Sequence, residues 1–269
     1  MTLPNPFHPE DLLDLGAAYT RLHDSLIRLN LPPGPASAKE VVENLLTSQA
    51  LARRTLDAGT AVHTAPRLRH SPEVRAAVDR MSQLATLTVI AADHLIAAAD
   101  LLYPDAGASP DRHQAEGLLD PDRAGALTHI RRAKEMTSLG AEDCLTTAGL
   151  LAREMHEQNR GPLVQPPRLS SAQHSALLAV AAGRVSLYQG KVTVARGRER
   201  ISITTIRTLE NRNLLHREPC VLWMHDERPH LSPEGRRAVA AVLSRPRSPA
   251  PMARRPTARP AADRSVMVR

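Results

Sequence analysis

Apolar side chains recur every three or four positions through most of the first 160 residues, which is the spacing of one buried helix face. The first run extends from Leu12 to Leu29 and stops at LPPGP, residues 31–35. Because this spacing brings its apolar residues onto one side, the pattern predicts an amphipathic helix at the start of the chain.

Three further helical segments follow, and each has a recognisable start. SAKE at 37–40 is a capping box that predicts the beginning of the second helix. SPE at 71–73 supplies a capping serine and a first-turn proline to a third helix, about 45 Å long at 1.5 Å per residue. A fourth segment, 121–159, follows Asp120 and contains Gly140, which favours a break. Long helices joined by short Pro/Gly turns predict an antiparallel bundle of four or five helices.

The pattern changes after RGPLVQPPRLS, residues 160–170, whose prolines cannot continue a helix. VSLYQGKVTV alternates apolar and polar residues about a Gln-Gly turn, which predicts a β-hairpin. The remaining pattern predicts helices over 170–182, 201–213 and 232–243, and extended chain over 214–231 with a turn at HDER.

These patterns predict a mainly α chain in which an antiparallel helical bundle precedes a small α+β domain. The expected segments are a bundle over 1–160, a linker over 161–169, the α+β domain over 170–244 and a basic tail over 245–269. The tail is rich in Arg and Pro and carries too little apolar surface to fold, so we expect it to be disordered.

Composition narrows the class of protein. Aromatic residues are only 2% of the chain, so a core must rest on Leu, Ala, Val and Ile, which favours helix packing. Cys144 and Cys220 give no disulfide framework, and the N-terminal residues show no secretion signal. The most apolar stretch, TVIAADHLIAAADLL, is interrupted by charged residues and is too short to span a bilayer. We therefore expect a cytoplasmic protein without a membrane segment.

Charge is divided unevenly along the chain. Residues 1–167 hold 16 basic and 21 acidic side chains, a net charge of −5. Residues 168–244 hold 12 and 6, and residues 245–269 hold 7 and 1, so each of these segments carries +6. A basic C-terminal part favours a polyanionic partner. The alternative is that Arg-rich coding raises the charge of any surface, although the same coding left the first part acidic.

The predicted helix at 203–213 has two unlike faces. Ile203, Ile206 and Leu209 form one apolar stripe, and the only acid in the helix, Glu210, lies beside it. Side chains that hydrogen-bond base edges and phosphates cover the opposite side: Thr204, Thr205, Arg207, Thr208, Asn211 and Arg212. An exposed face of this composition without a carboxylate favours contact with nucleic acid.

Three segments, taken in order, resemble the winged helix-turn-helix domain of MarR-type transcription regulators. LSSAQHSALLAVAAG is similar to the LTxxQ opening helix of that family, and TLENRNLLHRE to its LExxGLLxRE recognition-helix end. HDERPHLSPEGRRAV resembles the wing with its Asp-x-Arg and LTxxG. The resemblance covers about residues 168–244 only.

The resemblance implies a site on duplex DNA. It implies that a wing arginine, Arg228, lies near the minor groove, and that five residues face the major groove: Thr204, Thr205, Arg207, Thr208 and Asn211. One feature departs from the family, since the predicted hairpin stands where the family has a second helix. Four cations of this insert precede the predicted recognition helix and would compensate: Lys191, Arg196, Arg198 and Arg200. The Arg-Gly-Arg of ARGRE is similar to minor-groove arms but lacks their flanking prolines, so a solvated loop is the alternative.

Other chemistry finds less support in the sequence. GRVSLYQGKV places six residues between Gly183 and Gly190 where a phosphate loop has four, and Val192 replaces the hydroxyl that would bind Mg²⁺. The one cluster of zinc-ligand types has no spacing typical of a closed site: His216, Cys220, His225 and His230. The predicted bundle has no Glu-x-x-His pair, so a carboxylate di-metal centre lacks its ligands there, and the chain has no serine elbow. We expect no cofactor, no metal and no enzymatic activity.

The sequence thus predicts a homodimeric DNA-binding protein of bacterial transcription regulation that recognises a sequence in double-stranded DNA. The seven arginines of the tail would either add sequence-independent affinity or be solvated only. One alternative is a protein-interaction adaptor, in which Val221 and Trp223 form a contact surface, although Trp223 is better explained as a core anchor of its own domain. A second is a bundle that binds a small ligand, for which the bundle offers few aromatic residues.

Overall fold

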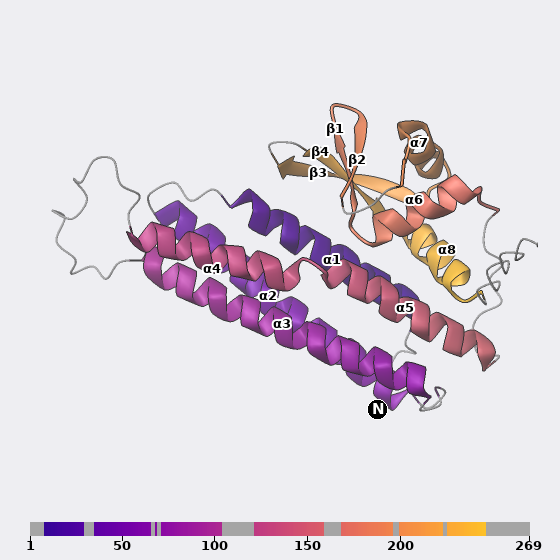
Figure 1. Cartoon of the computed structure of the whole chain (residues 1–269), viewed down its shortest axis with the longest axis horizontal. Helices are drawn as coiled ribbons and strands as arrows, with labels where there is room; N and C mark the ends of the chain where they lie inside the picture. Colours follow the sequence, from indigo (N-terminus) through magenta and orange to yellow (C-terminus); the bar gives the residue numbers. More distant parts are fainter. Residues whose placement is uncertain are drawn as a thin grey trace, which may run out of the picture.

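Long helices form the N-terminal part of the protein, and a small sheet with shorter helices lies along one side of them (Figure 1). The computed structural model describes residues 8–29, 35–65, 68, 71–103, 121–158, 168–195, 199–222 and 225–245. Within these residues the fold is mainly helical with one four-stranded antiparallel sheet near the C-terminal end, which confirms the predicted class at this level. The basic tail from residue 246 onward lies outside the described residues.

Five long helices make up the N-terminal part of the described chain: α1 (Pro9–Arg28), α2 (Pro35–Thr64), α3 (Pro72–Leu102), α4 (Pro121–Thr137) and α5 (Gly140–Glu157). The helices α4 and α5 lie end to end, and both pack against α1 and α3 (Figure 1). The predicted break at Gly140 is therefore confirmed, and α5 begins at this glycine. The ring of Tyr19 packs so closely on Gly140 that a side chain there would overlap it.

The helix starts follow local sequence signals, with one exception. The hydroxyl of Ser71 accepts a hydrogen bond from the backbone N–H of Val74, as predicted from SPE. The helix α2 instead begins at Pro35, two residues before SAKE, so Ser37 lies inside the helix and the capping-box prediction is wrong. Proline at the start has its fixed φ in the helical region and loses no hydrogen bond there, which permits this earlier start.

The bundle core is aliphatic around one buried tyrosine. Leu12, Leu22, Leu26, Leu84 and Leu95 are each at most 2% exposed, in line with the low aromatic content. The hydroxyl of Tyr19 lies 2.8 Å from Thr55 Oγ1 and 2.7 Å from Thr88 Oγ1. A buried hydroxyl needs a hydrogen-bond partner, and the partners of Tyr19 on α1 come from α2 and α3. The three hydroxyl groups therefore join these three helices.

The helix α3 contains the apolar stretch TVIAADHLIAAADLL. Its 31 residues are long and apolar enough to cross a membrane by length and composition alone, so the expectation that this stretch is too short is wrong. Core helices of proteins without a membrane segment pass the same test. One side of α3 packs against α2, α4 and α5, and Met81 on that side is 1% exposed.

The C-terminal part contains three helices and four strands among its described residues: α6 (Ser171–Ala181), β1 (Val185–Tyr188), β2 (Lys191–Val194), α7 (Ile203–Asn211), β3 (Leu215–Leu222), β4 (His225–Leu231) and α8 (Pro233–Leu243). The sheet order is β2-β1-β4-β3 with all neighbours antiparallel. The predicted β1–β2 hairpin is confirmed, with Tyr188 opposite Lys191. Its turn residues Gln189 and Gly190 have φ of 48° and 73°, as a two-residue hairpin turn requires.

The helix α1 belongs to both parts of the molecule. It packs on α2, α4 and α5 and also on α6, α8, β3 and β4. Buried apolar side chains of both parts form one continuous cluster, which includes Leu26 of α1 and Leu177 of α6. A side chain at Gly183 would lie 2.5 Å from Thr20 Oγ1, so α1 approaches the α6–β1 turn at backbone distance. The C-terminal part is therefore held against the bundle.

Candidate nucleic-acid interface

The helix α7 is fixed by its apolar stripe and by a cap. Ile206 and Leu209 are fully buried, and the partly buried Ile203 packs against the same core. The Ser202 hydroxyl accepts a hydrogen bond of 3.1 Å from the Thr205 N–H and thereby caps the helix. The predicted buried side of this helix is confirmed, and its opposite side is turned outward.

The outward face of α7 carries the residues that the sequence singled out. Thr204, Arg207 and Asn211 are exposed, and the side chains of these three have no hydrogen-bond or ion-pair partner among the described residues. Thr205 and Thr208 are half-buried. Their hydroxyls bond locally, Thr205 with Ser202 Oγ at 2.9 Å and Thr208 with the carbonyl oxygen of Thr204 at 2.8 Å. The free donors of this face are thus those of Arg207, Asn211 and Thr204.

Glu210, the only acid of α7, is removed from that face by an ion pair. Arg217 of β3 donates from Nε and Nη2 to the Glu210 carboxylate and from Nη1 to Glu227 of β4, at 2.5, 2.9 and 2.8 Å. Hydrogen bonds to Glu210 are the main cause that raises the pKa of Arg217 above its usual range. The arrangement fixes α7 to the sheet and leaves its outer face without negative charge.

Three of the other four acids of the C-terminal part are also paired with an arginine. Within the described residues, Glu199 pairs with Arg184, Glu218 with Arg21 and Glu234 with Arg237, and Asp226 accepts a hydrogen bond from the Gln189 N–H. Among the described lysines and arginines of this part, those without a carboxylate partner are Arg168, Lys191, Arg200, Arg207, Arg212 and Arg245. Four of these six lie on α7, on the β1–β2 hairpin or on the segments next to them: Lys191, Arg200, Arg207 and Arg212. Unpaired positive charge is therefore concentrated around α7.

Three other cations predicted to contact DNA lie on β2 and at the two ends of α7. Lys191 is exposed on β2 and Arg200 is exposed just before α7, whereas Arg196 and Arg198 lie outside the described residues. Arg212 is exposed at the end of α7, but its Nη1 donates to the carbonyl oxygen of Arg168 at 3.0 Å and to Gln173 Oε1 at 3.4 Å. Arg212 therefore also ties α7 to the start of α6.

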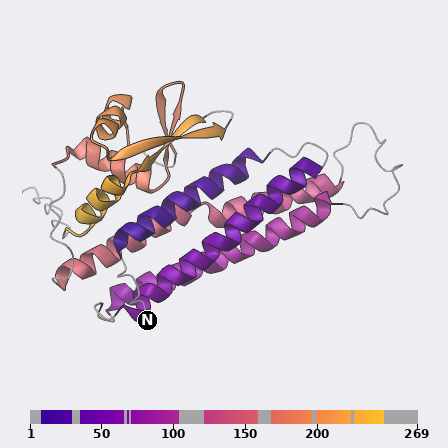
Figure 2. The same ribbon diagram turned by 180° about the vertical axis from the view of Figure 1, so that it is seen from behind.

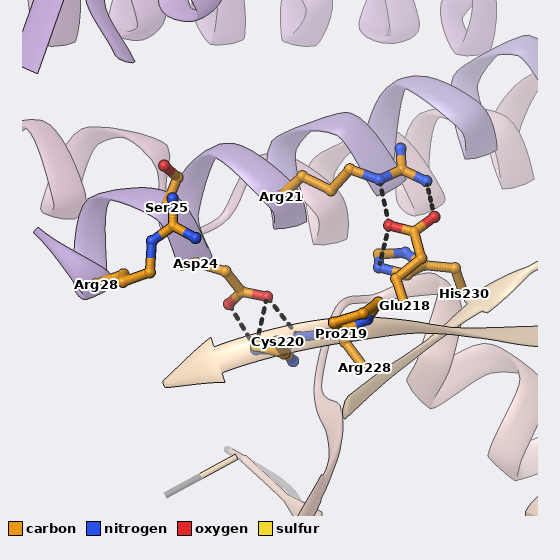
Figure 3. Close-up of a pocket in the computed structure, with 9 residues that line it drawn as sticks. All are labelled: Arg21, Asp24, Ser25, Arg28, Glu218, Pro219, Cys220, Arg228 and His230. Carbon is orange, nitrogen blue, oxygen red and sulfur yellow. Dashed lines mark hydrogen bonds and ion pairs between the residues drawn. The ribbon is translucent and has the colours of Figure 1, made fainter. Parts of the chain in front are cut away.

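Arg228 contradicts its predicted place on an exposed wing. It is 8% exposed, and its Nε and Nη2 donate to the two oxygens of Asp24 on α1 at 2.6 and 2.5 Å (Figure 3). Its Nη1 donates to the carbonyl oxygens of Gly183 and Val185 at 3.0 and 3.1 Å. Side chains alternate between the two faces of a strand, and that of Arg228 points from β4 toward α1. All three of its guanidinium nitrogens donate hydrogen bonds there. Nothing near Arg228 in the sequence indicates a partner 204 residues away.

A second ion pair lies beside the first at the junction of α1 and the sheet. Arg21 donates to both oxygens of Glu218 at 2.7 and 2.6 Å, and these hydrogen bonds lower the pKa of Glu218 to about 2 (Figure 3). Burial lowers the pKa of His230 to about 4, so the imidazole is neutral at pH 7 although it lies 3.5 Å from Glu218. These groups line a pocket of about 260 Å³. Its ionised groups are largely paired with each other, which makes the junction a structural contact.

The two surfaces of the C-terminal part face in different directions. The inner side of β3 and β4 lies against α1, while α7 and the β1–β2 hairpin project away from the bundle in both views (Figures 1 and 2). The helix α7 packs on α6 and β3. Among the described residues, the outer face of α7 has exposed side chains at Thr204, Arg207 and Asn211.

The histidines and the cysteine considered as zinc ligands do not converge on one point among the described residues. The rings of His216 and His230 stack with centroids 6.0 Å apart, and Cys220 Sγ lies 3.6 Å from Asp24 Oδ2. The side chains of Trp223 and His225 lie outside the described set. Within that set no group of three or more His, Cys, Asp or Glu side chains is arranged to hold a metal ion.

Comparison with known proteins adds no relative, since no family model, no curated protein and no solved structure matches the chain.

Proposed function

We propose that the protein binds double-stranded DNA in a sequence-dependent manner through the outer face of α7 and acts as a bacterial transcription regulator. The observation that carries this proposal is the concentration of unpaired cations around the outer face of α7, which carries no carboxylate. An α-helix fits the major groove, where arginine and asparagine side chains recognise guanine and adenine. Such contacts need donors that are free of internal partners, and Arg207 and Asn211 meet this requirement.

The resemblance to MarR-type winged helices supports the same reading. The order α6, β1, β2, α7, β3, β4 places α7 between an opening helix and an antiparallel strand pair, as in a winged helix-turn-helix domain. The β1–β2 hairpin stands where that family has its second helix, so we propose a variant in which the hairpin and α6 hold α7 in position.

The helical bundle would serve as the contact between two copies. A single helix reads few base pairs, and two copies on adjacent half-sites increase affinity and specificity. Leu46, Leu56 and Val89 are 59%, 50% and 46% exposed on α2 and α3, and a contact between two copies on these helices would cover them. A cytoplasmic location and the absence of a membrane role belong to this proposal.

Selection of DNA sequences tests the proposal most directly. The purified full chain is incubated with a random duplex library, and bound DNA is sequenced over several rounds. We expect enrichment of one motif, with binding that weakens steeply as salt is raised because phosphate contacts release counterions. Recovery of no motif together with no salt-sensitive binding would contradict the proposal and favour a protein-binding role.

A further inference from the structure

We propose that the β1–β2 hairpin is a second DNA-contacting element, in which Lys191 and Thr193 bind backbone phosphates beside the groove that α7 occupies. This inference rests on the proposed function of α7. It assigns to the hairpin a role that the sequence resemblance gives to the wing, whose Arg228 is bound to Asp24.

The side chains of β2 are divided between core and solvent. Val192 and Val194 are half-buried, and Val192 packs against the core, whereas Lys191 and Thr193 are exposed. Because neighbouring side chains of a strand point to opposite faces, Lys191 and Thr193 share one outer face. An ammonium group and a hydroxyl two residues apart are suited to phosphate oxygens, and β2 is an outer strand of the sheet with one side open.

The hairpin is also held firmly. Four residue pairs join β1 to β2, and the N–H of Gln189 donates to Asp226 Oδ2 at 2.7 Å. At the base, the Ala195 N–H donates to the carbonyl oxygen of Arg184, whose side chain pairs with Glu199 at 3.7 Å. A preorganised element loses little conformational entropy on binding, so even one phosphate contact contributes measurably.

The hairpin region carries an exposed cation, Lys191, and an exposed acid next to the turn, Asp226. The segment from Arg184 to Ala195 contains no acidic residue, and Lys191 has no carboxylate partner among the described residues. Asp226 is an exposed acid held against the turn through Gln189, so it opposes an approaching phosphate. Removing the charge of Lys191 and removing the charge of Asp226 must therefore change DNA affinity in opposite directions.

The position of the hairpin agrees with this role. It projects from the side of the C-terminal part that carries α7 and faces away from the bundle (Figures 1 and 2). Exposed Arg200 lies on the segment that joins the hairpin to α7. A duplex seated on α7 would therefore meet the hairpin as its neighbouring protein surface.

The experiment measures the affinity of the full chain for a selected duplex at several salt concentrations. Lys191→Gln should weaken binding about threefold to tenfold and reduce the slope of log affinity against log salt by about one, the loss of one phosphate contact. Lys191→Arg should retain the slope. Asp226→Asn keeps an acceptor for the Gln189 N–H and should tighten binding. Arg53→Gln, at an exposed arginine of α2 without a described partner, should match the wild type.

The outcomes separate the hairpin from α7. If the wild type binds its motif while Lys191→Gln keeps the full slope and Asp226→Asn changes nothing, the hairpin inference is wrong and the proposal for α7 stands. If the wild type shows no salt-sensitive DNA binding, the proposed function itself fails. Thermal melting of each variant checks folding, and the exposed positions of both side chains predict unchanged melting temperatures.

Discussion

The junction of α1 with the sheet and the outer face of α7 are both rich in arginine, yet they treat the guanidinium group in opposite ways. At the junction Arg228 is buried and donates to two carboxylate oxygens and two carbonyl oxygens. On α7, Arg207 is exposed and has no described partner. The charge of the first is used inside the molecule, and the charge of the second is available outside it. Pairing, more than residue type, separates a structural arginine from one that can bind a ligand.

The largest effect is expected from Asp24→Ala. The side chains of Asp24 and Arg228 are only 14% and 10% exposed, so this change leaves a buried guanidinium without its counterion. Loss of one partner of a buried pair costs about 3–5 kcal/mol. We expect the free energy of unfolding, measured by urea denaturation, to fall by about this amount.

An exposed pair provides the control for Asp24. Arg54 and Asp14 are 50% and 42% exposed, so Arg54→Ala should cost no more than about 1 kcal/mol. The double variant Asp24→Leu/Arg228→Met removes both buried charges and should regain part of the loss. Equal effects of Asp24→Ala and Arg54→Ala would show that the junction is open to water and that the contrast with α7 is wrong.

Acid should weaken the junction before it affects the face of α7. Burial lowers the folded-state pKa of His230 from 6.5 to about 4, so between these values the unfolded chain binds a proton that the folded protein does not. Stability therefore falls as the pH drops through this window, by on the order of 3 kcal/mol in total. Glu218 adds a further loss as the pH drops from 4.5 toward about 2, because its folded-state pKa is lowered.

Melting temperature measured against pH checks this expectation. His230→Gln should flatten the curve between pH 6.5 and 4, whereas the exposed His156, changed to Gln, should leave the slope intact. A curve of unchanged slope in His230→Gln would mean that other groups govern the acid response.

Arg207→Ala should change DNA recognition and leave stability almost unchanged, the opposite of the effect expected from Asp24→Ala. Its side chain is exposed and has no hydrogen-bond or ion-pair partner among the described residues, so the free energy of unfolding should stay within about 0.5 kcal/mol of the wild type. Discrimination between the selected motif and single-base variants should fall by about 1–3 kcal/mol if Arg207 is bidentate to guanine. Competition binding with mutated duplexes measures this loss. Weakening that is equal on every sequence would assign Arg207 to a phosphate.

Much of the fold could be predicted because its signals are local. The periodic leucines of α1, the Ser71 cap and the Gln-Gly turn each act within a few residues, and the structure confirms them. The start of α2 was missed because two local signals compete there, Pro35 and the capping box. Local chemistry thus fixes most elements, but it does not choose between adjacent starts.

The site could be predicted only in part, because ion pairing is a property of the folded chain. The outward face of α7 follows from helical periodicity, and its exposure is confirmed at Thr204, Arg207 and Asn211. Arg207, Arg217 and Arg228 look alike in the sequence. The structure separates them through Glu210, Glu227 and Asp24, and Asp24 lies in another part of the molecule. The sequence therefore predicted the exposed face of α7 correctly, but it placed Arg228 on an exposed wing, whereas the residue is buried against Asp24.

Arg212 combines both kinds of arginine, and its replacement should give the smallest effects. Its Nη1 holds the ends of α7 and α6 together from an exposed position, which is worth about 0.5–1 kcal/mol. Its Nε and Nη2 have no described partner and can meet a phosphate. Arg212→Ala should therefore lower stability slightly and weaken binding to matched and mismatched duplexes alike, with a salt slope reduced by about one. Denaturation and salt-dependent binding of the same variant measure the two contributions. A loss confined to the matched duplex would place Arg212 on a base and extend the recognition face of α7 to its last turn.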